Sequence, residues 1–267
     1  MKIEVDLSDL RGAVTAAVPH MAKANTFAAE QGLGVVRLQL TGQGLQVSAT
    51  DQMSLASTLI EAEVNSDEAD PVDLTPTSIK GLLSVFPAPG KDSLGERIRI
   101  ESRTEPGSSD QPSEHPPSSV TFTDVSGLFE GASLTVTEYP AEKFPDVPLA
   151  LRGLLARQGQ PAPAGLVVNP ELLHRFEAAS KAFGEPLEVR SIPQAPGADR
   201  GVLLVGVGSR FIGAARAEFS DEPELPLTST WLDRLPGHAP SDPFAESLVW
   251  TTSTTDDGTA RSGHEVE

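Results

Sequence analysis

The stretch LLVGVGSRFIGAARA, residues 203–217, decides between two interpretations of the chain. Its glycines, Gly206, Gly208 and Gly213, lie in an apolar run and could form a phosphate-binding loop. Such loops follow the spacing G-x-G-x-x-G or end in Gly-Lys-Ser/Thr, and neither pattern is present. The sequence therefore predicts two β-strands joined by a turn near Gly208 and Ser209, and it argues against a nucleotide site.

Predicted strands joined by turns recur along most of the chain. Three segments, at roughly 1–64, 71–139 and 165–217, repeat one order of predicted elements: a strand, a helix and then three strands. Apolar and polar residues alternate in the strand segments, which is typical of antiparallel strands joined by short turns. We expect an α+β fold of repeated βαβββ modules, with antiparallel sheets and helices on one face.

Each predicted helix has a start signal and an apolar side. The helix within 8–24 can be capped by Ser8 or Asp9, and Pro19 is expected to end or kink it. The helices within 76–91 and 169–183 each begin with a polar cap followed by proline, a favoured first helical residue. The caps of these two helices are Thr75 and Asn169, and the expected core residues are Leu10, Val14, Val18, Met21, Ile79, Leu82, Leu83, Phe86, Leu172, Leu173, Phe176 and Phe183.

Composition narrows the functional classes. The chain of 267 residues has no cysteine, which excludes disulfides and thiolate metal sites and favours a reducing compartment. Its first residues carry no apolar signal segment, so we expect a soluble, cytoplasmic protein. The formal net charge of −18 repels nucleic acid on average, so any DNA-binding surface must gather basic residues locally.

Five stretches, taken in order, resemble the bacterial DNA polymerase III beta-type sliding clamps, also called processivity factors. They are MKIEVDLSDLRGAV (1–14), GLQVSATDQMSLASTLIEAEV (44–64), VDLTPTSIKGLLSVFP (72–87), LTVTEYPAEKFPDVP (134–148) and NPELLHRFEAASKAFGEPLEV (169–189). The pairs Tyr139-Pro140 and Phe144-Pro145 resemble the signature that closes a clamp domain. The resemblance implies a shortened and divergent DNA clamp, since family clamps have six modules and this chain shows three.

The resemblance also implies a domain organisation. Residues 1–148 correspond to one clamp-like domain of two modules, and 149–217 to part of a second. Residues 218–267 hold eleven acidic and two basic residues together with Trp231 and Trp250, and we expect a largely disordered acidic tail. A ring of family size then needs about four chains. It needs three if 149–164 and the tail supply a degenerate fourth module.

The function implied is that of a homo-oligomeric ring that encircles double-stranded DNA without sequence specificity and serves a DNA polymerase and a clamp loader. The three predicted helices hold six basic and three acidic residues, whereas the rest of the chain holds fourteen basic and thirty-five acidic. Lys80, Arg175 and Lys181 lie off the apolar sides, so we expect them to be exposed. The candidate DNA-binding residues are Arg11, Lys23, Lys80, Lys91, Arg175 and Lys181.

An enzyme is not expected, because no catalytic constellation is visible. The histidines lack metal-ligand spacing, and no G-x-S-x-G motif occurs. These histidines are His20, His115, His174, His238 and His264. The sequence predicts no cofactor and no metal. The alternative that it leaves open is a protein of the clamp fold that binds partner proteins and does not hold DNA.

Overall fold

The computed structural model describes residues 2–64, 70–89, 95–104, 118–138, 141, 143–156, 166–193 and 200–219. All of them belong to one compact unit, Met1–Pro223, and the second unit, Glu224–Glu267, lies outside the described residues. Several residues named above therefore fall outside the description: Lys91, the pair Tyr139-Pro140, the tail residues Trp231 and Trp250, and the histidines His115, His238 and His264.

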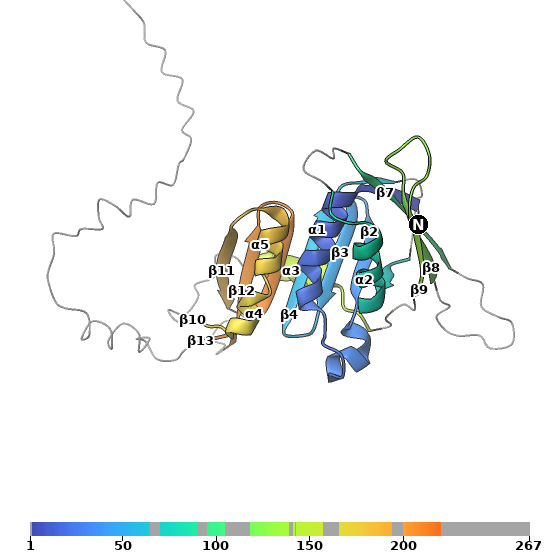
Figure 1. The fold of residues 1–267 in the computed structure, drawn as a ribbon. Coiled ribbons are helices and arrows are strands. Elements are labelled where there is room, and N and C mark those ends of the chain that lie inside the picture. The colour runs from blue at the N-terminus through green and yellow to red at the C-terminus, as the bar shows by residue number, and fades with distance from the viewer. Residues whose placement is uncertain are drawn as a thin grey trace, which may run out of the picture. The chain divides into compact units, whose positions relative to one another are not determined.

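The three predicted modules are present in the predicted order (Figure 1). The first contains β1 (Lys2–Asp6), α1 (Leu7–Ala17), β2 (Val36–Thr41), β3 (Gly44–Thr50) and β4 (Ser54–Ile60), followed by the short β5 (Ala62–Val64). The second contains β6 (Val72–Leu74), α2 (Pro76–Val85), β7 (Arg97–Thr104), β8 (Ser118–Asp124) and β9 (Ser133–Glu138). The third contains β10 (Leu166–Val167), α4 (Pro170–His174), α5 (Glu177–Phe183), β11 (Leu187–Pro193), β12 (Arg200–Val207) and β13 (Phe211–Phe219).

The strands form two antiparallel sheets, and the first two modules exchange their first strands. The five-stranded sheet has the order β5-β1-β7-β8-β9, and Ile3 of β1 faces Ile100 of β7. In the other sheet β6 pairs with β2, and the order is β11-β12-β13-β4-β3-β2-β6 with β10 beside β13. These pairings confirm the α+β class, and they join the third module to the first through β13 and β4.

The quoted stretch forms β12, a turn at Gly208–Arg210 and β13, as predicted. Its alternation places Leu203 and Val205 on one face of the sheet, where α1, α4 and α5 pack. Leu204 points to the opposite face, which is covered by α3 (Val147–Leu155). The third module therefore has helices on both faces of its sheet.

The helix starts differ from the expectation at one place. Asp6, and not Ser8 or Asp9, caps α1, because its Oδ1 accepts from the backbone N–H of Ser8 at 2.7 Å and of Asp9 at 3.2 Å. Thr75 and Asn169 cap α2 and α4 as predicted. Helix α1 ends at Ala17 and continues as a short 3₁₀ turn, Val18–His20, which contains Pro19.

The core agrees with the predicted apolar sides apart from three positions. Val18 and Leu173 are exposed, and Leu83 is partly buried. Helix 169–183 is interrupted at Arg175 and Phe176 into α4 and α5. Leu172 and Phe176 occupy the buried side of this segment, and Leu173 lies off it. The remaining predicted core residues are buried: Leu10, Val14, Met21, Ile79, Leu82, Phe86, Leu172 and Phe183.

Candidate nucleic-acid interface

Three helices lie in a row, with α1 between α2 and α5 (Figure 1). Gly12 allows α1 to approach α5 closely, because a Cβ at this position would lie 3.3 Å from Cε1 of Phe183. On the other side, Arg11 of α1 contacts the end of α2. The row therefore includes one helix from each module.

Arg11 is occupied in joining two of these helices. Its Nη1 donates to the carbonyl oxygen of Leu83 at 2.9 Å and also to that of Phe86, at the C-terminal end of α2. These carbonyls have no partner within their own helix, and a cation at a helix C-terminus is favourable. Burial lowers the pKa of the Arg11 guanidinium.

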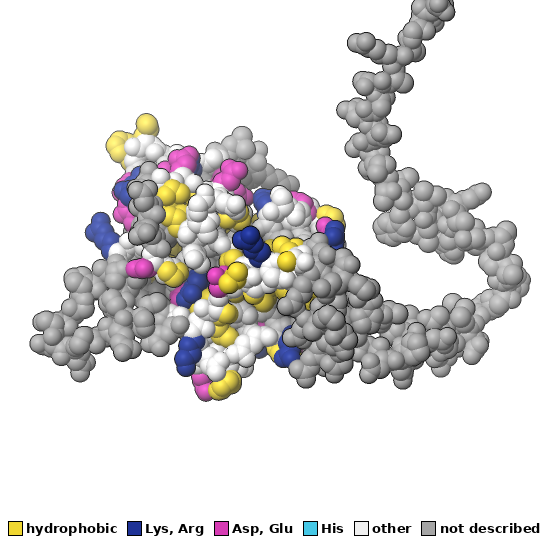
Figure 2. Space-filling model, turned by 180° about the vertical axis from the view of Figure 1, so that it is seen from behind, with side chains coloured by type: hydrophobic (Ala, Val, Ile, Leu, Met, Phe, Trp, Pro, Cys, Tyr) yellow, Lys and Arg dark blue, Asp and Glu magenta, His cyan; other side chains and the backbone are white. Residues whose placement is uncertain are grey.

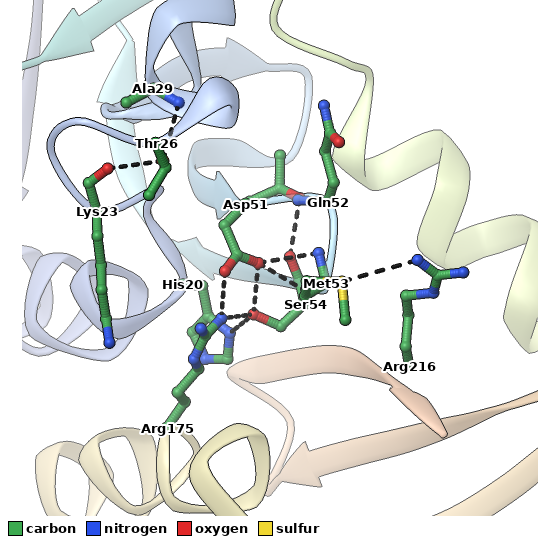
Figure 3. Close-up of polar contacts among 11 residues, drawn as sticks. His20, Lys23, Thr26, Ala29, Asp51, Gln52, Met53, Ser54, Arg175 and Arg216 are labelled. Carbon is green, nitrogen blue, oxygen red and sulfur yellow. Dashed lines mark hydrogen bonds and ion pairs between the residues drawn. The ribbon is translucent and has the colours of Figure 1, made fainter. Parts of the chain in front are cut away.

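The expectation that Arg175 is exposed is wrong. Its side chain is 16% exposed, and its Nη1 lies 2.7 Å from Oδ2 of Asp51 and donates to Oγ of Ser54 at 2.6 Å (Figure 3). A cation that leaves water needs a paired anion and hydrogen bonds, and both are supplied by the turn between β3 and β4. Arg175 therefore ties the third module to the first.

Asp51 organises the turn that receives Arg175. Its Oδ1 accepts from the backbone N–H of Met53 at 3.0 Å and of Ser54 at 2.8 Å. Gln52, at the tip, has a φ of 74°, an uncommon value for a residue with a side chain. One carboxylate thus fixes a tight turn with one oxygen and binds the partly buried Arg175 with the other.

His20 completes this cluster from the end of α1. Its Nδ1 lies 3.1 Å from Oγ of Ser54, and its ring centroid lies 4.8 Å from that of Phe176. Burial lowers the pKa of His20 to about 3, and the nearby Arg175 adds to this effect while Asp51 opposes it. The imidazole is therefore neutral at neutral pH.

The cluster contains the residue types of a hydrolase triad, namely Ser54, His20 and Asp51. Here these residues hold parts of the protein together and do not form a catalytic site. Ser54 and His20 are buried, so a substrate cannot reach the hydroxyl. The sequence did not reveal the cluster because its members lie far apart in the chain, and Asp51 and Arg175 are separated by 124 positions. The described residues also contain no group of three or more side chains placed to hold a metal ion.

Three of the candidate cations reach solvent. Lys23, Lys80 and Lys181 are all exposed, and Lys181 forms an ion pair with Glu177 one turn before it. Among the described residues, Lys23 and Lys80 have no ion pair. Lys80 and Lys181 lie on α2 and α5, the outer helices of the row (Figure 1).

A second charged contact, also missed from sequence, joins the opposite end of α1 to the third module. Arg210 Nη1 lies 3.2 Å from Oδ1 of Asp9, and its guanidinium lies 4.8 Å from the ring centroid of Phe183. Burial and the neighbouring Asp6 raise the pKa of Asp9, while Arg210 partly offsets this. Arg210 thus bridges the start of α1 and the end of α5.

No protein-family model and no curated protein matches the sequence. Solved structures of DNA polymerase III beta sliding clamps do resemble the fold. The sliding clamp from Bacillus subtilis matches with a TM-score of 0.51 and 15% identity over 82% of this chain and 64% of its own. The beta subunit from Thermotoga maritima matches with a TM-score of 0.49 and 14% identity, over 82% of this chain and 66% of its own.

A third match is the Helicobacter pylori beta clamp bound to a DNA ligase peptide, with a TM-score of 0.49 and 14% identity, over 85% of this chain and 69% of that one. This chain thus spans less than two thirds of the length of the first two clamps. At such identities the likeness concerns the fold, and it rests on the Bacillus subtilis match.

In the part of the chain that the structure describes, no helix has the length and apolar character needed to cross a membrane.

Proposed function

We propose that this chain is a sliding-clamp-like factor that assembles around duplex DNA without sequence specificity and recruits a DNA polymerase or another DNA-processing enzyme. The observation that carries the proposal is the row of helices α2, α1 and α5, which carries the exposed Lys80 and Lys181 in a chain with a net charge of −18. In this proposal the row faces the DNA. The clamp fold of the Bacillus subtilis match supports the same arrangement at the level of architecture.

The charge of the proposed surface suits loose binding. Lys23 and Lys80 are exposed and have no ion pair among the described residues, and Lys181 is exposed beside its partner Glu177. Arg11 and Arg175, by contrast, are engaged within the protein. Contacts to phosphates alone carry no sequence information, and a small number of them gives weak binding that is sensitive to salt. A factor that slides along DNA needs this kind of contact.

The sheet edges supply a route to assembly. Strand β9 ends the five-stranded sheet and β11 ends the larger sheet in the part of the chain that the structure describes. An open strand edge is a template for pairing with another chain. In this proposal 1–148 is one clamp domain and 149–217 is half of a second, so several copies are needed to close a ring.

A second candidate function is a clamp-fold interaction protein that does not hold DNA. Two of the six predicted DNA-binding residues, Arg11 and Arg175, are used inside the protein, and this observation favours that alternative. Its partners would be proteins, and the acidic body would repel DNA.

A topological retention assay separates the two functions. Linear duplex is anchored to a bead by one end, protein is threaded over the free end, and that end is then blocked by a bulky complex. A ring is expected to stay on the DNA through a high-salt wash and to leave when the duplex is cut. Release during the wash, with the end still blocked, would support the interaction protein.

A further inference from the structure

The junction between the first and third modules has little apolar packing on the side where α4 and α5 lie. Among the described residues, the apolar core around Phe176 reaches the first module through two small side chains, Ala16 of α1 and Ala56 of β4. Hydrophobic stabilisation is roughly proportional to the apolar area removed from water. Two alanines therefore contribute little to holding the third module on the first at this side.

On the other side of the larger sheet, the two modules share a broader apolar core. This core joins Ala22 and Leu33 of the first module to Leu204 and Ala214 of the third, and α3 packs over it. Figure 2 shows the molecule from behind, on the side away from α1 and α5, with hydrophobic side chains spread over its described surface. The contact around α3 is thus suited to remain closed when the helix side opens.

Polar atoms without partners lie at the weakly packed side of the junction. Nε2 of His20 and Oγ1 of Thr58 are both buried without a hydrogen-bond partner. The ring of His20 packs against Phe176 and Phe211 of the third module at centroid distances of 4.8 and 6.2 Å, and Thr58 pairs with Phe211 across the two strands. A buried polar atom without a partner lowers stability, so the closed junction is incompletely satisfied.

A second proton on the imidazole of His20 is not accommodated in the closed junction. An imidazolium donates from both ring nitrogens. Nδ1 faces Oγ of Ser54 at 3.1 Å, but Nε2 has no acceptor. Arg175 donates to the same hydroxyl and disfavours a nearby positive charge, and Asp51 opposes this effect only in part.

The other elements around His20 supply no further compensation in the part of the chain that the structure describes. Strands β3 and β4 contain no charged residue. The charged residues of α1 are engaged elsewhere, Asp9 with Arg210 and Arg11 with the end of α2. On β13, Arg216 contacts Sδ of Met53. A charged His20 therefore gains an acceptor for Nε2 only from water.

We infer that protonation of His20 opens the junction on its helix side, separating α4 and α5 from α1 while the contact around α3 acts as the hinge. The junction is thus an acid-sensitive switch, and it operates whether or not the chain holds DNA. Burial keeps the pKa of His20 at about 3 in the closed junction, whereas an imidazole in water has a pKa of about 6.5. The open fraction is therefore expected to rise about 30-fold between about pH 7.5 and about pH 5.

Thiol labelling of the full chain tests this switch, because the chain has no cysteine. Ala16→Cys reports on the junction, and the matched control is Ala13→Cys, which is equally buried on the same helix but lies in the core of the first two modules. Dithiodipyridine is the probe, and each labelling rate is divided by that of the same variant unfolded in urea at the same pH. The normalised rate of Ala16→Cys is expected to rise about 30-fold from about pH 7.5 to about pH 5. At the lower pH it should exceed that of Ala13→Cys at least about tenfold, since local opening needs less free energy than unfolding.

Equal normalised rates for the two variants at the lower pH would mean that the whole unit unfolds in acid, and this result overturns the inference. A second variant, His20→Gln combined with Ala16→Cys, assigns the proton and is expected to show a rise of less than about threefold. The full rise in this variant, or no rise with His20 present, also overturns the inference. If the combined variant does not fold, Ala16→Cys alone decides: its rate should rise about tenfold per pH unit below about pH 6, as one proton requires, and a steeper dependence overturns the inference.

Discussion

At the residue scale, Arg175 and His20 show how one buried cluster can fix a molecular junction. Arg175 reaches from the end of α4 to Asp51 and Ser54, and His20 reaches the same serine from the end of α1. Arg175, Asp51, Ser54 and Nδ1 of His20 each have a polar partner within the cluster, whereas Nε2 of His20 is buried without one. Removing one of the paired groups therefore leaves another buried group without compensation. The cluster therefore stabilises one particular position of the third module on the first.

His20 should make the protein sensitive to acid. Its folded-state pKa of about 3 lies below the ordinary value of 6.5, so the unfolded state binds the proton first as the pH falls. The protein therefore loses stability as the pH falls from about 6.5 toward about 3. Lowering the pH from about 7.5 to about 5 should reduce the free energy of unfolding by about 2 kcal/mol through His20 alone. Urea titrations at both pH values measure this loss, and His20→Gln should reduce it.

The control for this experiment is Leu173→Gln, because Leu173 is exposed and carries no titratable group. It should leave the difference between the two pH values unchanged. If His20→Gln also retains the full acid sensitivity, carboxylates and not the buried imidazole are responsible.

Phe176 should be among the most costly residues to truncate. It is fully buried and packs against the rings of His20 and Phe211 at centroid distances of 4.8 and 6.2 Å. Phe176→Ala should lower the unfolding free energy by about 3–5 kcal/mol, since it leaves a cavity. Leu173→Ala, three positions earlier and 42% exposed, should cost less than about 1 kcal/mol. Similar losses in urea titrations would contradict the packing described here.

At the element scale, the sequence predicted the helices and strands of each module but not how the modules pair with one another. Alternating residues predicted the strands, and Thr75 and Asn169 predicted two helix starts, because these signals are local. The exchange of β1 and β6 between sheets depends on pairing partners far along the chain, which no local pattern encodes. The break between α4 and α5 was missed because Leu173 and Phe176 both fit a helical apolar side.

Two glycines allow a test of element packing. A Cβ at Gly213 in β13 would lie 2.7 Å from Cε1 of Phe176 and 2.9 Å from the carbonyl oxygen of Leu55, so Gly213→Ala should cost about 1–3 kcal/mol. Gly153 in α3 has no atom within 4 Å of such a Cβ, so Gly153→Ala should stabilise by about 0.5–1 kcal/mol. Thermal unfolding of both variants measures the difference. A stabilising Gly213→Ala would mean that Phe176 and β13 are less close than these distances indicate.

At the scale of the whole molecule, counting charges on predicted helices overstated the surface available to DNA. The count could not show that Arg175 lies beside Asp51 or that Arg11 binds the end of α2, because both partners are distant in sequence. It did select the exposed Lys80 and Lys181, since an exposed lysine on the polar side of a helix is a local property. Lys23 is also exposed, but it lies beyond the 3₁₀ turn Val18–His20 and not on the helix predicted over 8–24. Fewer basic side chains are therefore available on the proposed DNA-facing surface than the sequence suggested.

Neutralising these three lysines should weaken DNA binding through salt-dependent contacts. If each contacts one phosphate, the triple variant Lys23→Gln, Lys80→Gln and Lys181→Gln should lower the slope of log affinity against log salt by about 2.7. Fluorescence anisotropy of a labelled duplex over a range of salt concentrations measures the slope. The fold should be unaffected because all three side chains are exposed.

A matched triple variant separates location from net charge. Lys143→Gln, Arg152→Gln and Arg216→Gln remove the same charge from exposed residues, two of them on α3 and β13. The α3 side of the larger sheet is opposite to α1 and α5, since Leu204 and Leu203 point to different faces. This control should keep most of the slope if the helix row faces DNA. Equal losses would mean that the duplex responds only to total charge, and the row of helices would lose its assignment as the DNA-facing surface.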